Sequence, residues 1–264
     1  MMAGKAMRRL LVAACLVVAA PAWAGRSCEE TPMSVAETVK SMDLAQRTFE
    51  ALDASGSQVA LVSRAGQDLS KYGLHYSHMG IVVRDHPAGR WTVVHELNEC
   101  GTAASALYNE GLGNFFLSGL FRHDAQVVIP GPEAQARLAQ LVTTRTARRL
   151  HDADYNMLSY AWSTRYQNSN QWVLETYAAA SAPAGQVETR EEAQAWLKQT
   201  GFAPITVYVP SVKRLGGRMF RANVAFDDHP FGRRMAGQID TITTDAIVRY
   251  VQAVDPAAKV ITVE

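Results

Sequence analysis

Two β-rich runs separated by a short connection constrain the fold more than any other feature of this sequence. Residues 78–84 (HMGIVVR) and 91–96 (WTVVHE) are rich in Val, Ile and Trp, which are typical of strands. The six residues between them, 85–90, include a proline and a glycine, which suit a hairpin connection. A third β-rich run, 58–64 (QVALVSR), lies upstream. Together the three runs predict an antiparallel sheet that begins after an N-terminal helix.

Helical patterns lie on both sides of these strands. Ser34 and Glu37 have the spacing of a capping box, and the helix they open is expected to end at residues 53–56 (DASG). Residues 98–124 are rich in Gly and Asn, which indicates a structured loop. Further helices are expected at 133–150, 170–180 and 190–200, strands at 125–129 and 205–209, and a strand, a helix and a strand within 240–264. This pattern predicts an α+β fold, in which helices pack against an antiparallel sheet.

The N-terminus has the three parts of a secretory signal. A basic region that includes Arg8 and Arg9 precedes an apolar stretch at 10–20, and small residues at positions 22 and 24 favour cleavage before Gly25. The alternative is an uncleaved anchor or a buried first helix. We therefore predict a signal peptide at residues 1–24, a single domain at 25–264, and a location in the periplasm or outside the cell.

The charge balance argues against a nucleic acid as the main partner. The whole chain has 26 Lys and Arg against 25 Asp and Glu. Removing residues 1–24 removes three basic residues and no acidic one, so the remainder has 26 − 3 = 23 basic against 25 acidic residues. No basic stripe is left to follow a phosphate backbone. No later segment is apolar for long enough to span a membrane.

Two cysteines, Cys28 and Cys100, follow the expected cleavage point. In an oxidising compartment an even number of cysteines favours one disulfide, and the alternative is two unpaired thiols. The chain has neither a CxxC motif nor the Cys and His spacing of a zinc site. We expect no metal and no cofactor.

His78 is the first candidate for catalysis, because it begins a predicted strand and lies two residues before a glycine that allows close approach. A histidine on a rigid element suits a general base, although it could equally hydrogen-bond a loop. His95 and Glu96, in the next strand, are candidates to orient its ring. Since side chains alternate along a strand, only one of the two can share the face of His78.

The second candidate site is the polar run at 166–171 (YQNSNQ), which leads directly into an apolar helix. Ser169 is therefore expected near a helix N-terminus, where exposed amides can stabilise an oxyanion. Asn168, Asn170 and Gln171 are candidates to support it. The alternative is an ordinary helix cap, for which Asn and Ser are preferred.

These elements resemble the circularly permuted papain-like superfamily, which includes NlpC-type cell-wall peptidases and the lecithin–retinol acyltransferase group. The shared pattern is a strand with Ser-His-x-Gly-Ile/Val-Val, a strand with a polar residue at its end, and a helix that opens after Asn-x-polar. The resemblance covers about residues 58–180, with 181–264 as a C-terminal extension. It implies that His78 is the base, that His95 is the third residue, and that Ser169 stands where the family has a cysteine.

The chain also resembles the domain-of-unknown-function family 2145 of exported bacterial proteins. The segments that carry this resemblance are GLHYSHMGIVVRD, WTVVHELNECG, YQNSNQWVLE and FRANVAFDDHP. This resemblance implies an exported domain and no particular activity.

The serine at position 169 departs from the papain-like pattern, because a hydroxyl is a far poorer nucleophile than a thiol at neutral pH. A serine can still hydrolyse esters when a histidine activates it. We therefore expect an exported hydrolase or acyltransferase that acts on an amide or ester bond, with Ser169 as nucleophile, His78 as base, and His95 or Glu96 behind it. Cell-wall peptide or lipid is the substrate class that the resemblance implies. The alternative is a non-catalytic periplasmic binding module that uses the same cleft.

Overall fold

The computed structural model describes residues 32–144 and 146–264. The expected signal peptide, the cleavage point before Gly25 and Cys28 lie outside these residues. Cleavage and the Cys28–Cys100 disulfide therefore remain predictions. Within the described residues, no helix combines the length and the apolar character needed to cross a membrane.

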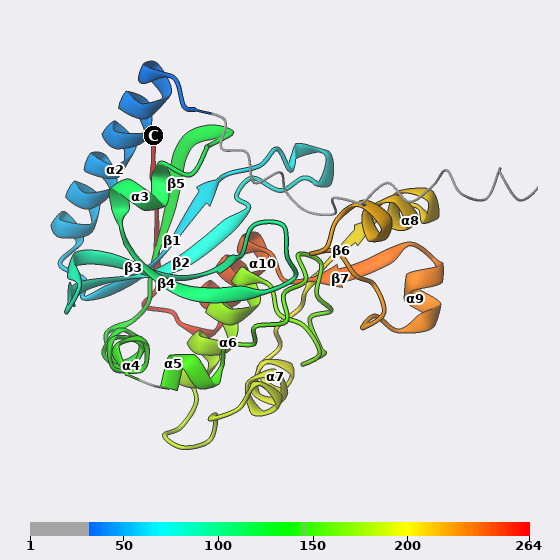
Figure 1. Cartoon of the computed structure of the whole chain (residues 1–264). Coiled ribbons are helices and arrows are strands. Elements are labelled where there is room, and N and C mark those ends of the chain that lie inside the picture. The colour runs from blue at the N-terminus through cyan, green and yellow to red at the C-terminus, as the bar shows by residue number, and fades with distance from the viewer. Residues whose placement is uncertain (1–31, 145) are drawn as a thin grey trace, which may run out of the picture.

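A six-stranded antiparallel sheet forms the centre of the molecule, with the strand order β4-β3-β2-β1-β5-β8 (Figure 1). Its strands are β1 (Val59–Ala65), β2 (His78–His86), β3 (Gly89–Asn98), β4 (Ser105–Gly111), β5 (Arg122–Ile129) and β8 (Lys259–Val263). The predicted hairpin is present, because β2 pairs with β3 and only Pro87 and Ala88 lie between them. The α+β class with an antiparallel sheet is confirmed.

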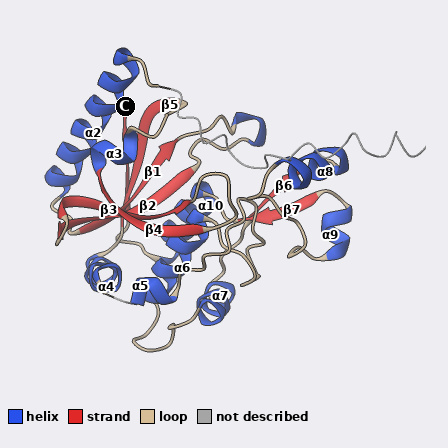
Figure 2. Cartoon of the chain, in the orientation of Figure 1, coloured by secondary structure: helices blue, strands red, loops and turns tan. Residues whose placement is uncertain are grey.

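Helices cover both faces of this sheet (Figure 2). One face carries α2 (Val35–Ser55) and α3 (Leu112–Phe116). The other face carries α4 (Pro132–Thr143), α5 (Thr146–Arg149), α6 (Ser169–Ser181), α7 (Arg190–Gln199) and α10 (Thr244–Val254). Helix α2 begins with the expected capping box, in which the Ser34 hydroxyl accepts from the Glu37 amide, and it ends at Gly56 in the left-handed conformation.

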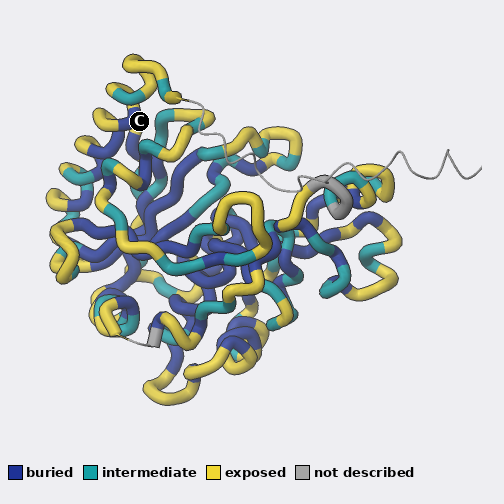
Figure 3. The backbone as a smooth tube through the Cα atoms, viewed as in Figure 1, coloured by how far each residue is buried: buried dark blue, intermediate teal, exposed yellow. Residues whose placement is uncertain are grey.

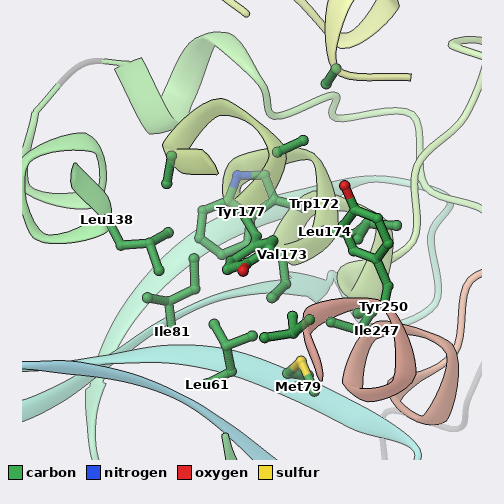
Figure 4. Packing of buried hydrophobic residues seen from close by; sticks show 14 of the residues in the cluster. Leu61, Met79, Ile81, Leu138, Trp172, Val173, Leu174, Tyr177, Ile247 and Tyr250 are labelled. Atoms are coloured by element: carbon green, nitrogen blue, oxygen red, sulfur yellow. The ribbon is translucent and has the colours of Figure 1, made fainter. Parts of the chain in front are cut away.

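Strand β2 shows why the sequences of the central strands are continuously apolar. Met79 and Ile81 pack in the core beneath α6, where Trp172 and Tyr177 also lie (Figure 4). Val82, which points the opposite way, belongs to the core beneath α2 and α3. Both faces of the sheet are therefore buried, as the dark central tube in Figure 3 shows.

A smaller unit projects beside the main sheet (Figure 1). It contains the antiparallel pair β6 (Ile205–Tyr208) and β7 (Gln238–Thr241), with α8 (Ser211–Phe220) and α9 (Phe231–Met235) between them. Val207, Val209, Val224, Phe226 and Ile239 form its own small core. We call residues 205–241 the arm.

Several sequence predictions need correction. Residues 98–124, expected to be loop, contain β4, α3 and the start of β5. Strand β4 lies at the edge of the sheet and exposes much of its surface, so it lacks a run of apolar residues. The single helix expected at 133–150 is two helices, α4 and α5, and the helices α8 and α9 were not predicted.

Candidate active site

Three side chains on neighbouring strands form a continuous hydrogen-bonded chain. The Nε2 atom of His78 lies 2.9 Å from Nδ1 of His95, and Nε2 of His95 lies 3.2 Å from Oε2 of Glu110. His78 begins β2, His95 lies in β3, and Glu110 lies in β4. We call these residues the His–His–Glu chain. Among the described residues, no group of three or more His, Cys, Asp or Glu side chains is arranged to hold a metal ion.

The His–His–Glu chain lies on the sheet face that carries α2 and α3. The ring centroid of Phe115, in α3, is 5.8 Å from that of His78 and 5.3 Å from that of His95. The guanidinium of Arg64 lies 4.7 Å from the Phe115 centroid and donates to the Phe115 carbonyl and the Ser118 hydroxyl. A hydrophobic ring and a buried cation therefore enclose the two imidazoles.

This environment favours neutral imidazoles. Burial lowers the pKa of His78 well below its ordinary value of 6.5, and the charge of Arg64 lowers it further. Burial also lowers the pKa of His95, and its hydrogen bond to Glu110 offsets part of that effect. The same hydrogen bond lowers the pKa of Glu110, so this carboxylate is ionised at neutral pH.

The protonation states determine which nitrogen atoms carry hydrogen. The Glu110 carboxylate can only accept, so Nε2 of His95 must donate to it. The Nδ1 atom of neutral His95 is then an acceptor, and Nε2 of His78 must donate to it. The Nδ1 atom of His78 is left with a free lone pair, as a general base requires.

Gly80 allows β2 and β3 to approach closely at this point. A Cβ at position 80 would lie 2.6 Å from Cγ1 of Val93 and 3.1 Å from Cβ of His95. Both contacts are shorter than ordinary van der Waals separations. The glycine therefore positions His95 against His78, in line with the close approach expected from the sequence.

The N-terminus of α6 is attached to the start of β2 through Asn170. The amide of Asn170 accepts from the Met79 backbone N–H at 3.0 Å and donates to the Ser77 carbonyl at 3.3 Å. These two backbone groups flank His78. Asn168 is the helix cap, because its side chain accepts from the Gln171 N–H at 2.9 Å. The neighbouring Ser169 hydroxyl is therefore not used as the cap.

Ser169 and His78 are not hydrogen-bonded to each other in the structure. The Ser169 hydroxyl lies 3.4 Å from the hydroxyl of Tyr155, and Ser169 is only 7% exposed. Strand alternation directs the His78 ring towards the α2 and α3 face, whereas α6 packs on the other face. His78 and Ser169 are thus brought to the same end of β2 without direct contact.

The predicted supporting amides are already engaged. Asn168 also donates to the Thr241 hydroxyl, and Gln171 accepts from Ser159 and donates to Glu175. These side chains hold the loops around α6, and their role as oxyanion donors stays a prediction. The backbone N–H groups of Ser169 and Asn170 are further donors in the first turn of α6, whereas the Gln171 N–H already donates to Asn168.

Glu96 lies on the opposite face from the His–His–Glu chain, so His95 is the residue that shares the face of His78. Burial raises the pKa of Glu96 to about 8, and a nearby Ser105 hydroxyl and the charge of Arg190 offset only part of that rise. Among the described residues, neither carboxyl oxygen of Glu96 has a partner at hydrogen-bonding geometry. Glu96 therefore cannot orient the ring of His78.

Sequence reasoning missed Glu110 and Tyr155. Glu110 lies in β4, which was expected to be loop, and Tyr155 lies in an irregular segment that bridges to Gln167 and donates its N–H to the Ala103 carbonyl. The segment 105–111 (SALYNEG) shows no alternation of apolar and polar residues, so no local pattern marked Glu110. No local signal marked Tyr155, because its position depends on contacts with distant segments.

The comparisons with known proteins identify a family. The family model described as "Uncharacterized protein conserved in bacteria (DUF2145)" matches residues 51–251. These residues include the His–His–Glu chain, Ser169 and most of both sheets. Searches of the curated proteins and of the solved structures found no match. Because the family model covers well over half of the 264 residues, this chain belongs to the DUF2145 family.

Proposed function

We propose that the protein is an exported hydrolase or acyltransferase of the permuted papain-like type, acting on an ester or amide bond. The observation that carries this proposal is the His–His–Glu chain, which leaves the lone pair of His78 Nδ1 free. Asn170 joins the backbone on either side of His78 to the first turn of α6. That turn begins with Ser169, and its hydroxyl is not used as the helix cap.

In the proposed reaction, the Ser169 oxygen attacks the acyl carbon while His78 Nδ1 takes the hydroxyl proton. The bond to the leaving group breaks, and the leaving group receives that proton from His78. Water, or another acceptor, then attacks the acyl carbon while His78 takes its proton. The bond between the Ser169 oxygen and the acyl group breaks, His78 returns the proton to Ser169, and the acid or the transferred product is released. Backbone amides at the start of α6 would stabilise the oxyanion.

The reaction requires the Ser169 hydroxyl to turn from Tyr155 and the start of β2 or of α6 to shift, because the His78 ring points to the α2 and α3 face of the sheet. A serine side chain exchanges rotamers readily, and catalytic hydrogen bonds are often long before substrate binds. Burial raises the pKa of Tyr155 to about 12, so its phenol stays protonated at neutral pH. Tyr155 can therefore hold the resting hydroxyl without removing its proton.

Active-site labelling with a fluorophosphonate tests this proposal. We expect the wild-type protein to be labelled on Ser169, and the label to be lost in Ser169→Ala and His78→Ala. Ser105→Ala is the matched control, because the Ser105 hydroxyl lies 3.1 Å from Nε2 of His151 and so also has a histidine beside it as a candidate base. Labelling that survives Ser169→Ala and disappears in Ser105→Ala would assign the nucleophile to Ser105 and reject this mechanism.

A binding module is the second candidate function. The burial of Ser169 and its contact with Tyr155 favour it. In that case the fluorophosphonate labels neither the wild type nor any variant. The wild type and Ser169→Ala then bind cell-wall peptide or lipid with equal affinity. The same substrate class applies to both candidates, since it comes from the papain-like resemblance.

A further inference from the structure

The arm exposes an unusual share of the apolar surface. Among the described residues, eleven large apolar side chains are exposed, and five of them lie in the arm. These five are Tyr208, Val212, Leu215, Phe231 and Met235. The arm covers residues 205–241, so nearly half of the exposed large apolar side chains occur in a small fraction of the chain.

Helix α8 presents two of them to solvent on one side. Val212 is 83% exposed and Leu215 is 63% exposed, and a separation of three residues places them on the same side of the helix. The opposite side packs inward, where Arg214 donates to the Val209 carbonyl at 2.7 Å. Gly217 packs there as well, against Val224. The exposed side of α8 therefore has no partner in the described part of the chain.

Helix α9 repeats this arrangement at the same end of the molecule (Figure 1). Phe231 is 70% exposed and Met235 is 58% exposed, four residues apart. The guanidinium of Arg234 lies 5.7 Å from the Phe231 ring centroid. Tyr208, on β6, is 65% exposed. Apolar side chains with a cation beside them suit the boundary between lipid headgroups and acyl chains.

The arm is also basic in a chain that is otherwise acidic. It holds six Lys and Arg against three Asp, whereas the rest of residues 25–264 holds 23 − 6 = 17 basic against 25 − 3 = 22 acidic residues. Each acidic side chain of the arm already has a partner in the protein. The Asp228 side chain is fully buried beside His229, Asp240 pairs with Arg233, and Asp227 pairs with Arg165 outside the arm. Lys213 and Arg221 are exposed.

We propose that the arm binds the surface of an anionic phospholipid bilayer, with α8 and α9 as the contact. The exposed apolar pairs would enter the headgroup region, and the basic side chains would face the lipid phosphates. The net positive charge of the arm is complementary to an anionic bilayer, and it opposes the pairing of two arms of like charge through the same surface. This inference is independent of the proposed catalytic activity.

Co-sedimentation with vesicles tests the proposal. Protein expressed from the full-length chain and purified after export would be mixed with vesicles of phosphatidylcholine alone or of phosphatidylcholine and phosphatidylglycerol. We expect binding to the anionic vesicles only, and weaker binding at high salt because the Debye length shortens. Val212→Ser with Leu215→Ser should lower the partition coefficient at least about tenfold. Lys213→Glu should lower it at least about fivefold.

Val35→Ser with Val39→Ser is the matched control, because these residues of α2 are 82% and 51% exposed and lie far from the arm in sequence. This variant should bind as the wild type does. Circular dichroism would show that each variant is folded. Failure of the wild type to bind anionic vesicles, or equal loss in the control, would overturn the proposal. If the wild type instead associates with itself and does not bind vesicles, and only the arm variants abolish this association, the surface belongs to a contact with a second copy.

Discussion

The Nε2 atom of His78 lies 2.9 Å from Nδ1 of His95, so the two rings determine each other's tautomer. Because Glu110 accepts from Nε2 of His95, both hydrogen bonds of the His–His–Glu chain run from His78 towards Glu110. The result is a free lone pair on Nδ1 of His78, at the end of the sheet nearest Ser169. Removal of the carboxylate should therefore affect the base even though Glu110 does not contact His78.

We expect Glu110→Gln to lower the rate of fluorophosphonate labelling about tenfold at pH 7. A neutral amide can still accept from His95, but it no longer stabilises the imidazolium that forms when His78 takes a proton. Asn109→Ala is the control, since Asn109 lies beside Glu110 on β4 and points the other way. Equal rates in wild type and Glu110→Gln would show that the carboxylate has no part in activation.

The buried His95 and the partly buried His78 should make stability depend on pH. Their pKa values are lower in the folded state than the ordinary 6.5, so the unfolded state binds more protons in the acidic range. Their contribution is complete above pH 6.5 and is lost as the pH falls through the folded-state values. In urea unfolding at a series of pH values, the stability of the wild type relative to His78→Gln should fall below pH 6.5. A constant difference would mean that His78 is not buried in its neutral form.

Glu96→Gln should stabilise the protein at neutral and alkaline pH. The pKa of Glu96 is raised from 4.5 to about 8, so its contribution to wild-type stability is greatest below pH 4.5 and is lost as the pH rises towards 8. Glutamine keeps the shape and has no charge to desolvate. The gain should reach up to about 3 kcal/mol at pH 7 and vanish near pH 4. Destabilisation at every pH would show that the carboxyl has a partner that glutamine cannot replace.

Arg190→Met should cost about 3–5 kcal/mol in the free energy of unfolding, because it leaves the buried Glu175 carboxylate without its cation. Arg190 Nε lies 2.9 Å from Glu175, and its other nitrogens reach Asp152 and two backbone carbonyls. Arg149→Met is the control, since its pair with Glu188 is exposed and 3.9 Å apart, and it should cost less than about 1 kcal/mol. Glu175→Gln in the Arg190→Met background should recover part of the loss. No recovery would argue against an uncompensated charge as the cause.

Gly80→Ala should cost about 1–3 kcal/mol, because the added methyl would overlap Val93 and press against His95. It should also slow fluorophosphonate labelling, since β3 must shift and carry His95 with it. Gly66→Ala meets only the Ser77 hydroxyl, at 3.4 Å, and serves as the control. Unfolding in urea measures the first effect and labelling the second. A Gly80→Ala protein with wild-type values in both would show that the strands have room to separate.

The elements that depend on local patterns were predictable. The capping box at Ser34, the β2–β3 hairpin and helix α6 follow from turn chemistry, propensity and periodicity within short segments. Strand β4 was not predictable in this way, because an edge strand with one solvated face carries little apolar signal.

For the site, the sequence by itself determined which residue types stand at the start of β2, in β3 and at the start of α6. It also determined that only one of His95 and Glu96 could share the face of His78, since strand side chains alternate. Which one does so depends on how β3 is placed in the sheet, and so on the tertiary structure. The same holds for the partnership of Glu110 with His95 and of Tyr155 with Ser169, because hydrogen bonds between distant segments depend on the register and packing of the whole sheet.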